Sequence, residues 1–81
     1  MKSIFAFSAA WCPNCPRMKP VWEKLKEDYE VNVIDVDEYP EKAKDWGVQS
    51  LPTTLIVENE EEVDRVVGAR PYSFMLEKLK D

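Results

Sequence analysis

The chain has 81 residues, enough for one compact domain with a modest core, and we expect residues 1–81 to form that single domain. Its 11 Lys and Arg against 16 Asp and Glu give a net charge of −5, which argues against binding of nucleic acids or anionic membranes. The absence of histidine excludes imidazole base catalysis, and two glycines are too few for a phosphate-binding loop, so the reactive chemistry centres on Cys12 and Cys15.

The first half of the chain predicts a βαβ unit. Residues 3–8 are a short apolar run, expected to form a central strand that is covered on both faces. Helical periodicity then predicts a helix over residues 13–29, with a kink where Pro16 and Pro20 remove backbone donors. The β-branched residues 31–36 predict a second strand, parallel to the first. The apolar face of the predicted helix consists of Met18, Val21, Trp22, Leu25 and Tyr29.

The second half predicts a short helix, a hairpin and a final helix. The short helix opens around Pro40, stops at Gly47 and places Tyr39, Ala43 and Trp46 on one face. Residues 53–57 and 62–67 predict a hairpin whose second strand lies at the sheet edge and whose tip carries the acidic run 58–62. The final helix begins at Pro71, and its apolar face is formed by Tyr72, Met75, Leu76 and Leu79.

This order predicts an α/β fold with a minimal βαβ-ββα core, a four-stranded mixed sheet flanked by helices. The longest nearly apolar stretch, residues 4–13, is far shorter than the ~20 residues that span a bilayer, and its first part must serve as core. We therefore expect a cytoplasmic protein that does not associate with membranes. In that compartment a cysteine pair is more consistent with a cycling disulfide than with a permanent one.

The Cys12-Pro13-Asn14-Cys15 segment has the spacing of a redox-active dithiol. Residues three apart on a helix lie on one face, about 5–6 Å from each other, which suits a disulfide. If Cys12 is the N-cap or first helical residue, unpaired N–H groups and the helix dipole favour its thiolate, which makes Cys12 the expected nucleophile. Cys15, one turn further on, is the expected resolving thiol.

Two other interpretations of the cysteine pair stay open on the residues alone. The pair would supply half of a zinc site shared across a homodimer, or it would be two inert core cysteines.

Charge is uneven along the chain. Residues 2–26 hold five basic residues and one acidic residue, net +4, whereas residues 27–81 hold six basic and fifteen acidic residues, net −9. Arg17 and Lys19 would add positive potential near a thiolate, although Lys19 is also typical of a solvated helix face.

The sequence resembles the thioredoxin and glutaredoxin superfamily. Trp11-Cys12-x-x-Cys15 is similar to the thioredoxin Trp-Cys-x-x-Cys, and Pro20 matches the proline five residues after its second cysteine. Residues 48–53, ending in Leu51-Pro52-Thr53, are similar to the segment that holds the family's cis-proline, and residues 67–69 to its Val-Gly-Ala. The likeness covers nearly the whole chain, without the N-terminal strand and helix of full-length thioredoxins.

This resemblance implies a cis Leu51–Pro52 bond beside the cysteines, with the main chain of Leu51 available to pair with an extended substrate. Trp11 would flank the site as an exposed aromatic residue. The implied substrate-binding residues are Trp11, Pro13, Asn14, Leu51 and Pro52.

The chain also departs from the thioredoxin pattern. Ala6 stands where thioredoxins carry a buried aspartate that helps to deprotonate the resolving cysteine, and Val33 aligns with the lysine that accompanies it. The proton of Cys15 must then leave to water or to another carboxylate, with Asp35 and Asp37 as weak candidates. Pro13-Asn14 replaces the Gly-Pro between the thioredoxin cysteines.

The resemblance implies a thiol–disulfide oxidoreductase that reduces protein disulfides through a Cys12/Cys15 cycle. It would need no cofactor or metal, would act as a monomer, and would receive electrons from a thioredoxin reductase. One alternative is a glutaredoxin-like protein recycled by glutathione, whose carboxylates the positive segment would attract. Another is a non-catalytic binding module of the same fold.

Overall fold

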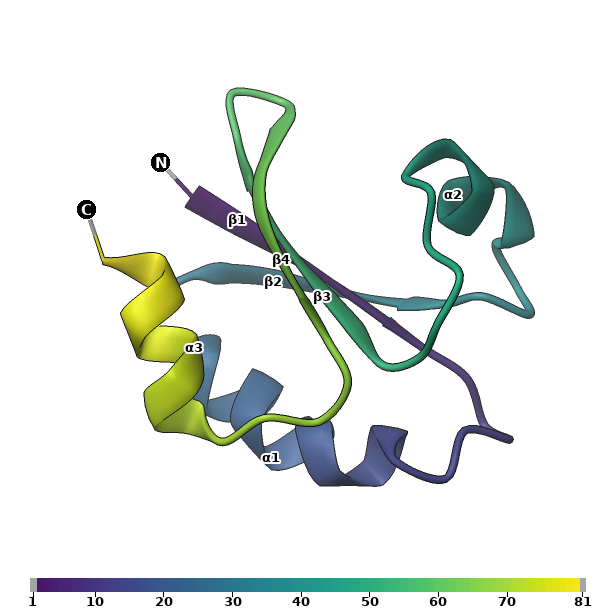
Figure 1. Ribbon diagram of the computed structural model, residues 1–81, viewed down its shortest axis with the longest axis horizontal. Coiled ribbons are helices and arrows are strands. Elements are labelled where there is room, and N and C mark those ends of the chain that lie inside the picture. Colours follow the sequence, from purple (N-terminus) through teal and green to yellow (C-terminus); the bar gives the residue numbers. More distant parts are fainter. Residues whose placement is uncertain (1, 81) are drawn as a thin grey trace.

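The computed structural model describes residues 2–80 and contains seven elements in the predicted order (Figure 1). They are β1 (Lys2–Ser8), α1 (Cys15–Leu25), β2 (Glu30–Asp35), α2 (Pro40–Asp45), β3 (Thr53–Glu58), β4 (Glu61–Val67) and α3 (Tyr72–Leu79). The four strands form one mixed sheet in the order β2-β1-β3-β4. The expected α/β architecture is confirmed, with β1 central and β4 at an edge.

Strand pairing follows from the connections between the strands. The α1 crossover brings β2 back parallel to β1, whereas β3 runs antiparallel to β1 and forms a hairpin with β4. The hairpin turns at Asn59 and Glu60, both with positive φ, so the acidic run 58–62 lies at an exposed tip. A register shift between Ile56 and Val57 bends this hairpin away from a regular ladder.

Helices cover both faces of the sheet (Figure 1). α1 and α3 pack on one face, where Trp22 is fully buried and its Nε1 donates to the Thr54 hydroxyl at 3.1 Å, fixing α1 to β3. On the opposite face Trp46, at the end of α2, meets Phe5 edge-on with ring centroids 5.3 Å apart. The core under α1 and α3 contains Ile4, Ala6, Met18, Trp22, Leu25, Ile56, Val66, Met75 and Leu79.

Two expectations about the helices need correction. α1 spans residues 15–25 and not 13–29, because Asn14 is its N-cap and the chain turns after Leu25. Tyr39 and Leu76, predicted on apolar faces, are 46% and 38% exposed, because Tyr39 precedes α2 as its N-cap and α3 buries only Met75 and Leu79. Pro20 lies inside α1 on its exposed side, and the helix continues through it.

The arrangement brings three loops to one end of the sheet. The β1–α1 loop carries the cysteine motif, the β2–α2 loop begins after Asp35, and the α2–β3 loop carries Leu51-Pro52. The amide of Gly68, after β4, donates to the carbonyl of Pro52 at 2.8 Å and ties a fourth segment to this end. None of the helices between residues 2 and 80 is long and apolar enough to cross a membrane.

Candidate active site

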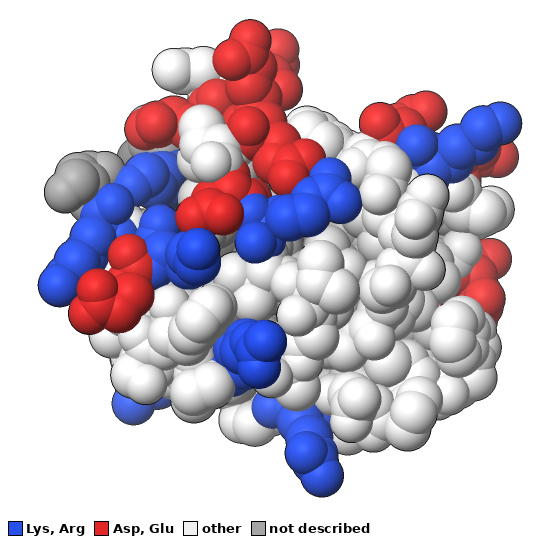
Figure 2. Space-filling view, viewed as in Figure 1, with Lys and Arg blue, Asp and Glu red and all other residues white. Residues whose placement is uncertain are grey.

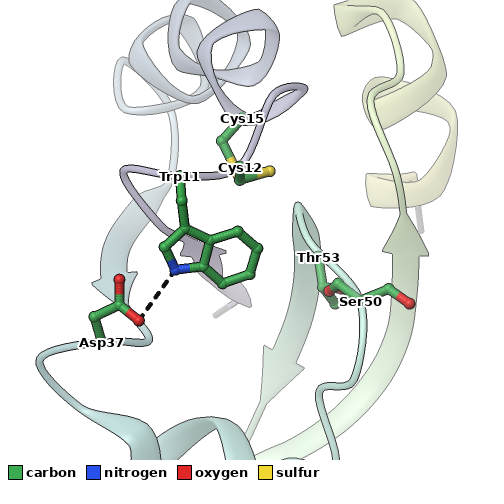
Figure 3. The surroundings of a disulfide bond; sticks show 6 residues. All are labelled: Trp11, Cys12, Cys15, Asp37, Ser50 and Thr53. Atoms are coloured by element: carbon green, nitrogen blue, oxygen red, sulfur yellow. Dashed lines mark hydrogen bonds between the residues drawn. A yellow bond between two sulfur atoms is a disulfide. The ribbon is translucent and has the colours of Figure 1, made fainter.

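Cys12 and Cys15 form a disulfide at the junction of β1 and α1 (Figure 3). Their Cα atoms are 5.4 Å apart, and the residues are only 4% and 2% exposed. After Ser8 the chain leaves the sheet, and the Cys12 amide donates to the Ala9 carbonyl at 3.2 Å in a tight turn. The turn presents both sulfurs where the helix begins.

The helix start differs from the sequence expectation. Cys15, and not Cys12, is the first residue of α1, and Pro13 lies in the preceding turn. Pro16 occupies the first turn of the helix, where a missing N–H group costs no hydrogen bond. Cys12 nevertheless shares the helix N-terminus through its bond to the Cys15 sulfur, so the positive end of the α1 dipole acts on both sulfur atoms.

Trp11 stands beside the disulfide with 65% of its surface exposed. Its indole Nε1 donates to Asp37 Oδ1 at 3.1 Å, and Figure 3 shows the other side of the ring directed toward the turn of Ser50 and Thr53. The Asp37 amide in turn donates to Asp35 Oδ1 at 2.9 Å. The β2–α2 loop therefore sets the position of an exposed aromatic ring that the sequence placed here only by resemblance.

The Leu51–Pro52 bond is cis, as the resemblance implied. Leu51 is half-buried and packs against the small cluster of Ala9, Cys12 and Cys15, and Pro52 is fully buried. The Thr53 hydroxyl donates to the Ser50 carbonyl and closes the turn. Pro13 and Asn14 lie exposed on the other side of the disulfide.

A hollow of about 260 Å³ adjoins Trp11 on the side of α2. Its walls are mostly apolar, which suits a hydrophobic side chain of a bound segment. The lining residues are Trp11, Val36, Pro40, Ala43, Val48, Gln49 and Leu51. Only Trp11 and Leu51 among them were predicted to bind substrate, because the sequence does not show that the helix around Pro40 and residues 48–49 lie beside Trp11.

A second hollow, of about 310 Å³, lies where β2 passes the start of α1. Cys15, Lys19 and Asp35 line it together, next to the exposed side chain of Val33. The two carboxylates that the sequence left as equal candidates are thereby distinguished, because Asp35 faces the hollow of Cys15 whereas Asp37 binds Trp11. Ala6 is fully buried in the apolar core beneath and supplies no polar group.

No group of three or more Cys, Asp or Glu side chains between residues 2 and 80 gathers closely enough to hold a metal ion. Both sulfurs are engaged with each other.

Comparison with known proteins gives one consistent family. The family model described as Thioredoxin matches residues 1–81. "Thioredoxin 2" of Chlorobaculum tepidum is 42% identical over 83 residues, covering 98% of this chain and 76% of the relative. A thioredoxin of Staphylococcus aureus is 39% identical over 77 residues, covering 90% of this chain and 74% of the relative.

Solved structures agree with the sequence relatives. A point mutant of a thioredoxin from Halobacterium salinarum superposes with a TM-score of 0.89 at 33% identity, covering 95% of this chain and 70% of the other. The oxidised mitochondrial thioredoxin 3 of Saccharomyces cerevisiae gives a TM-score of 0.83 at 34% identity, with 95% and 74% of the two chains covered.

Proposed function

The chain belongs to the thioredoxin family, and on that basis we propose that it reduces disulfides of other proteins with Cys12 as nucleophile and Cys15 as resolving thiol. Its activity class is thiol–disulfide oxidoreductase. The observation that carries the assignment of the residues is the Cys12–Cys15 disulfide at the N-terminus of α1, between an exposed tryptophan and the Leu51–Pro52 turn.

The proposed cycle transfers two electrons. The Cys12 thiolate attacks one sulfur of the substrate disulfide, and the other substrate sulfur leaves as a thiolate that takes up a proton from water. Cys15 then loses its proton and attacks the Cys12 sulfur. The second substrate sulfur leaves, and the Cys12–Cys15 disulfide forms. A reductase restores the dithiol by supplying two electrons and two protons.

We assign the proton acceptor of the second step to Asp35, with one water between it and Cys15. Asp35 is the only carboxylate among the residues that line the hollow of Cys15, and Lys19 contributes a positive charge to the same lining. Asp37 is committed to the Trp11 indole. A carboxylate near the thiol raises the rate of a step in which proton loss accompanies attack.

The substrate would lie across Trp11, Pro13 and Asn14 and pair with the main chain of Leu51 as an added strand, against Pro52. Leu51 contributes to both the cysteine cluster and the apolar hollow, which supports this placement. We further propose that the protein acts as a monomer in the cytoplasm with a thioredoxin reductase as electron donor. A reducing compartment is where a cycling dithiol is useful.

The direct test is reduction of insulin by dithiothreitol with catalytic protein. We expect Cys12→Ser to abolish catalysis. Pre-reduced Cys15→Ser, mixed with insulin in the absence of dithiothreitol, should accumulate a mixed disulfide with the substrate, detectable as a mass increase that reductant removes. Retained insulin reduction by Cys12→Ser would disprove the mechanism.

The proposed donor needs a separate comparison. Turnover with NADPH and a thioredoxin reductase should exceed turnover with glutathione, NADPH and glutathione reductase. The opposite order would assign the chain to glutathione instead.

A further inference from the structure

The three arginines of this chain have different surroundings. Arg65 is fully engaged, with its guanidinium bound to both Glu62 carboxylate oxygens and to the carbonyls of Trp46 and Gly47. Arg17 and Arg70 are exposed, and neither guanidinium has a carboxylate or carbonyl partner within residues 2–80. The Arg70 guanidinium lies 5.5 Å over the Phe74 ring, a contact that orients it without neutralising it.

Arg17 and Arg70 line one hollow of about 260 Å³. Val21, Ala69 and Pro71 complete its walls, so an apolar floor lies between two cationic groups. The Arg70 amide also donates to the Met18 sulfur at 3.4 Å, which fixes the segment after Gly68 against α1. Neither arginine side chain is needed for that contact, because only backbone and the Met18 side chain take part.

The two walls of the hollow belong to chain segments that also contribute to the redox site. Arg17 lies two residues after Cys15 on α1, in the first turn of the helix. Arg70 lies two residues after Gly68, whose amide is bound to the carbonyl of Pro52. Both walls therefore extend from segments that flank the disulfide.

Acidic and basic side chains gather in different parts of the face that Figure 2 shows. Figure 2 shows acidic side chains gathered around the β3–β4 tip, whereas the surface over α1 and the loop into α3 carries basic side chains on an otherwise uncharged ground. A guanidinium binds a carboxylate through two parallel N–H donors, and the strength of this pairing grows where apolar walls limit hydration.

We propose that Arg17 and Arg70 form a subsite for an acidic side chain of the protein substrate, near the disulfide that is reduced. This inference rests on the proposed function and adds a preference for one class of substrate. A Glu or Asp beside the substrate cysteine would lie between the two guanidinium groups while the cysteine meets Cys12. Discrimination against an uncharged residue at that position should be about 3- to 10-fold in kcat/KM, as for a partly exposed charge-assisted pair.

The test uses disulfide-bonded peptides in which a single Glu is moved through the three positions on either side of a cysteine, each matched with a Gln peptide. With the wild-type protein, at least one position should show faster reduction of the Glu peptide, and the preference should shrink as salt is raised. The double variant Arg17→Ala/Arg70→Ala should lose the preference, so that it reduces matched Glu and Gln peptides at equal rates.

The matched control is Lys26→Ala/Lys80→Ala, which removes the same charge from the far ends of α1 and α3. It should keep the Glu preference. A wild-type protein without any preference, a preference that survives in the arginine variant, or one lost equally in the lysine control would each overturn the subsite. Reduction of the Gln peptides reports separately on the redox mechanism, so failure of the subsite is distinguishable from failure of the proposed function.

Discussion

Ala6 places an apolar side chain where the sequence comparison with thioredoxins expects a buried aspartate near the disulfide. It is fully buried on β1 among Ile4, Met18 and Trp22, and the hydroxyl of Thr54, its partner on β3, already accepts the Trp22 indole hydrogen bond. An acid at this position would have to be desolvated there, which favours its neutral form. The chain therefore gains a continuous apolar core at this position and must move the Cys15 proton by another route.

Ala6→Asp should destabilise the protein in a pH-dependent manner. Burial raises the pKa of the introduced carboxyl in the folded state, so the folded protein binds the proton more tightly than the unfolded chain does. Stability then falls as pH rises from the unfolded pKa, about 3.9, toward the folded one. We expect a loss of about 2–4 kcal/mol at pH 7 and a smaller loss at pH 4 by urea unfolding. Ala6→Asn is the control, and an equal pH dependence of the two variants would contradict the argument.

Asp35→Asn should slow the resolving step and spare the first attack. The amide keeps the shape and the hydrogen bond to the Asp37 amide but accepts no proton. In stopped-flow reduction of a peptide disulfide, release of the second thiol should slow about 10-fold near neutral pH, less than for a fully engaged base because water remains an acceptor. Asp37→Asn, which still accepts the Trp11 hydrogen bond, is the control. Equal slowing in both variants would argue against Asp35.

The two cysteines could be predicted from the sequence, whereas the roles of the two nearby carboxylates could not. Spacing and residue type identified Cys12 and Cys15, because a dithiol needs both within one turn of a helix start. The assignment of Asp37 to Trp11 and of Asp35 to the Cys15 hollow depends on how the β2–α2 loop folds. Two acidic residues two positions apart look equivalent in sequence, and only the tertiary structure separates their environments.

At the scale of elements, Arg65 links the edge strand to the site loops. From β4 its guanidinium reaches the carbonyls of Trp46 and Gly47 at 2.8 and 3.2 Å, just after α2 and ahead of the Leu51–Pro52 turn. Hydrogen bonds from Arg65 lower the pKa of the Glu62 carboxyl, and the same pairing orients the guanidinium toward α2. An edge strand rich in charges thus has one charge with a structural role.

Arg65→Lys should cost about 1–2 kcal/mol at pH 7, because a single ammonium group cannot replace the planar fork that serves four acceptors. The lowered pKa of Glu62 means that this pairing stabilises the fold above the ordinary range of the carboxyl and is lost as pH falls through the folded pKa. Urea unfolding should therefore show a smaller difference between wild type and variant at pH 3 than at pH 7. Lys78→Arg, at the exposed pair with Asp64, is expected to be nearly neutral.

The boundaries of the elements illustrate why the fold was more predictable than its details. Hydrophobic periodicity predicted every strand and helix in the correct order, because each element has to bury one apolar face. The start of α1 was misplaced because Pro13 and Pro16 both suit a first turn, and the turn at Ala9 decides between them. Burial of Tyr39 and Leu76 was overestimated because the width of a buried stripe depends on helix length and packing partners.

At the scale of the whole molecule, charge and redox chemistry are spatially separated. The acidic hairpin tip and the cysteine end lie at different ends of the sheet (Figure 1), so the net charge of −5 does not describe the surface that a substrate meets. The disulfide also affects the free energy of unfolding of the whole domain, because it closes a loop in the unfolded chain and so lowers the conformational entropy of that chain.

The oxidised protein should be more stable than the reduced protein by about 2 kcal/mol, because the disulfide closes a short four-residue loop and removes conformational entropy from the unfolded state. By linkage, the folded disulfide is then about 30-fold harder to reduce than the same disulfide in the unfolded chain. The proposed preference of the α1 N-terminus for the Cys12 thiolate acts in the opposite direction, since it stabilises the folded reduced form wherever the thiol ionises.

Urea unfolding with and without dithiothreitol should therefore show a larger difference in the free energy of unfolding between oxidised and reduced protein at pH 5 than at pH 8. Cys12→Ser/Cys15→Ser, which forms no disulfide, should unfold identically with and without reductant at both pH values. A gap that does not narrow at pH 8 would mean that folding leaves the thiolate unstabilised. The nucleophilicity of Cys12 would then have to depend on contacts formed with the bound substrate beside Trp11, and not on the helix that follows it.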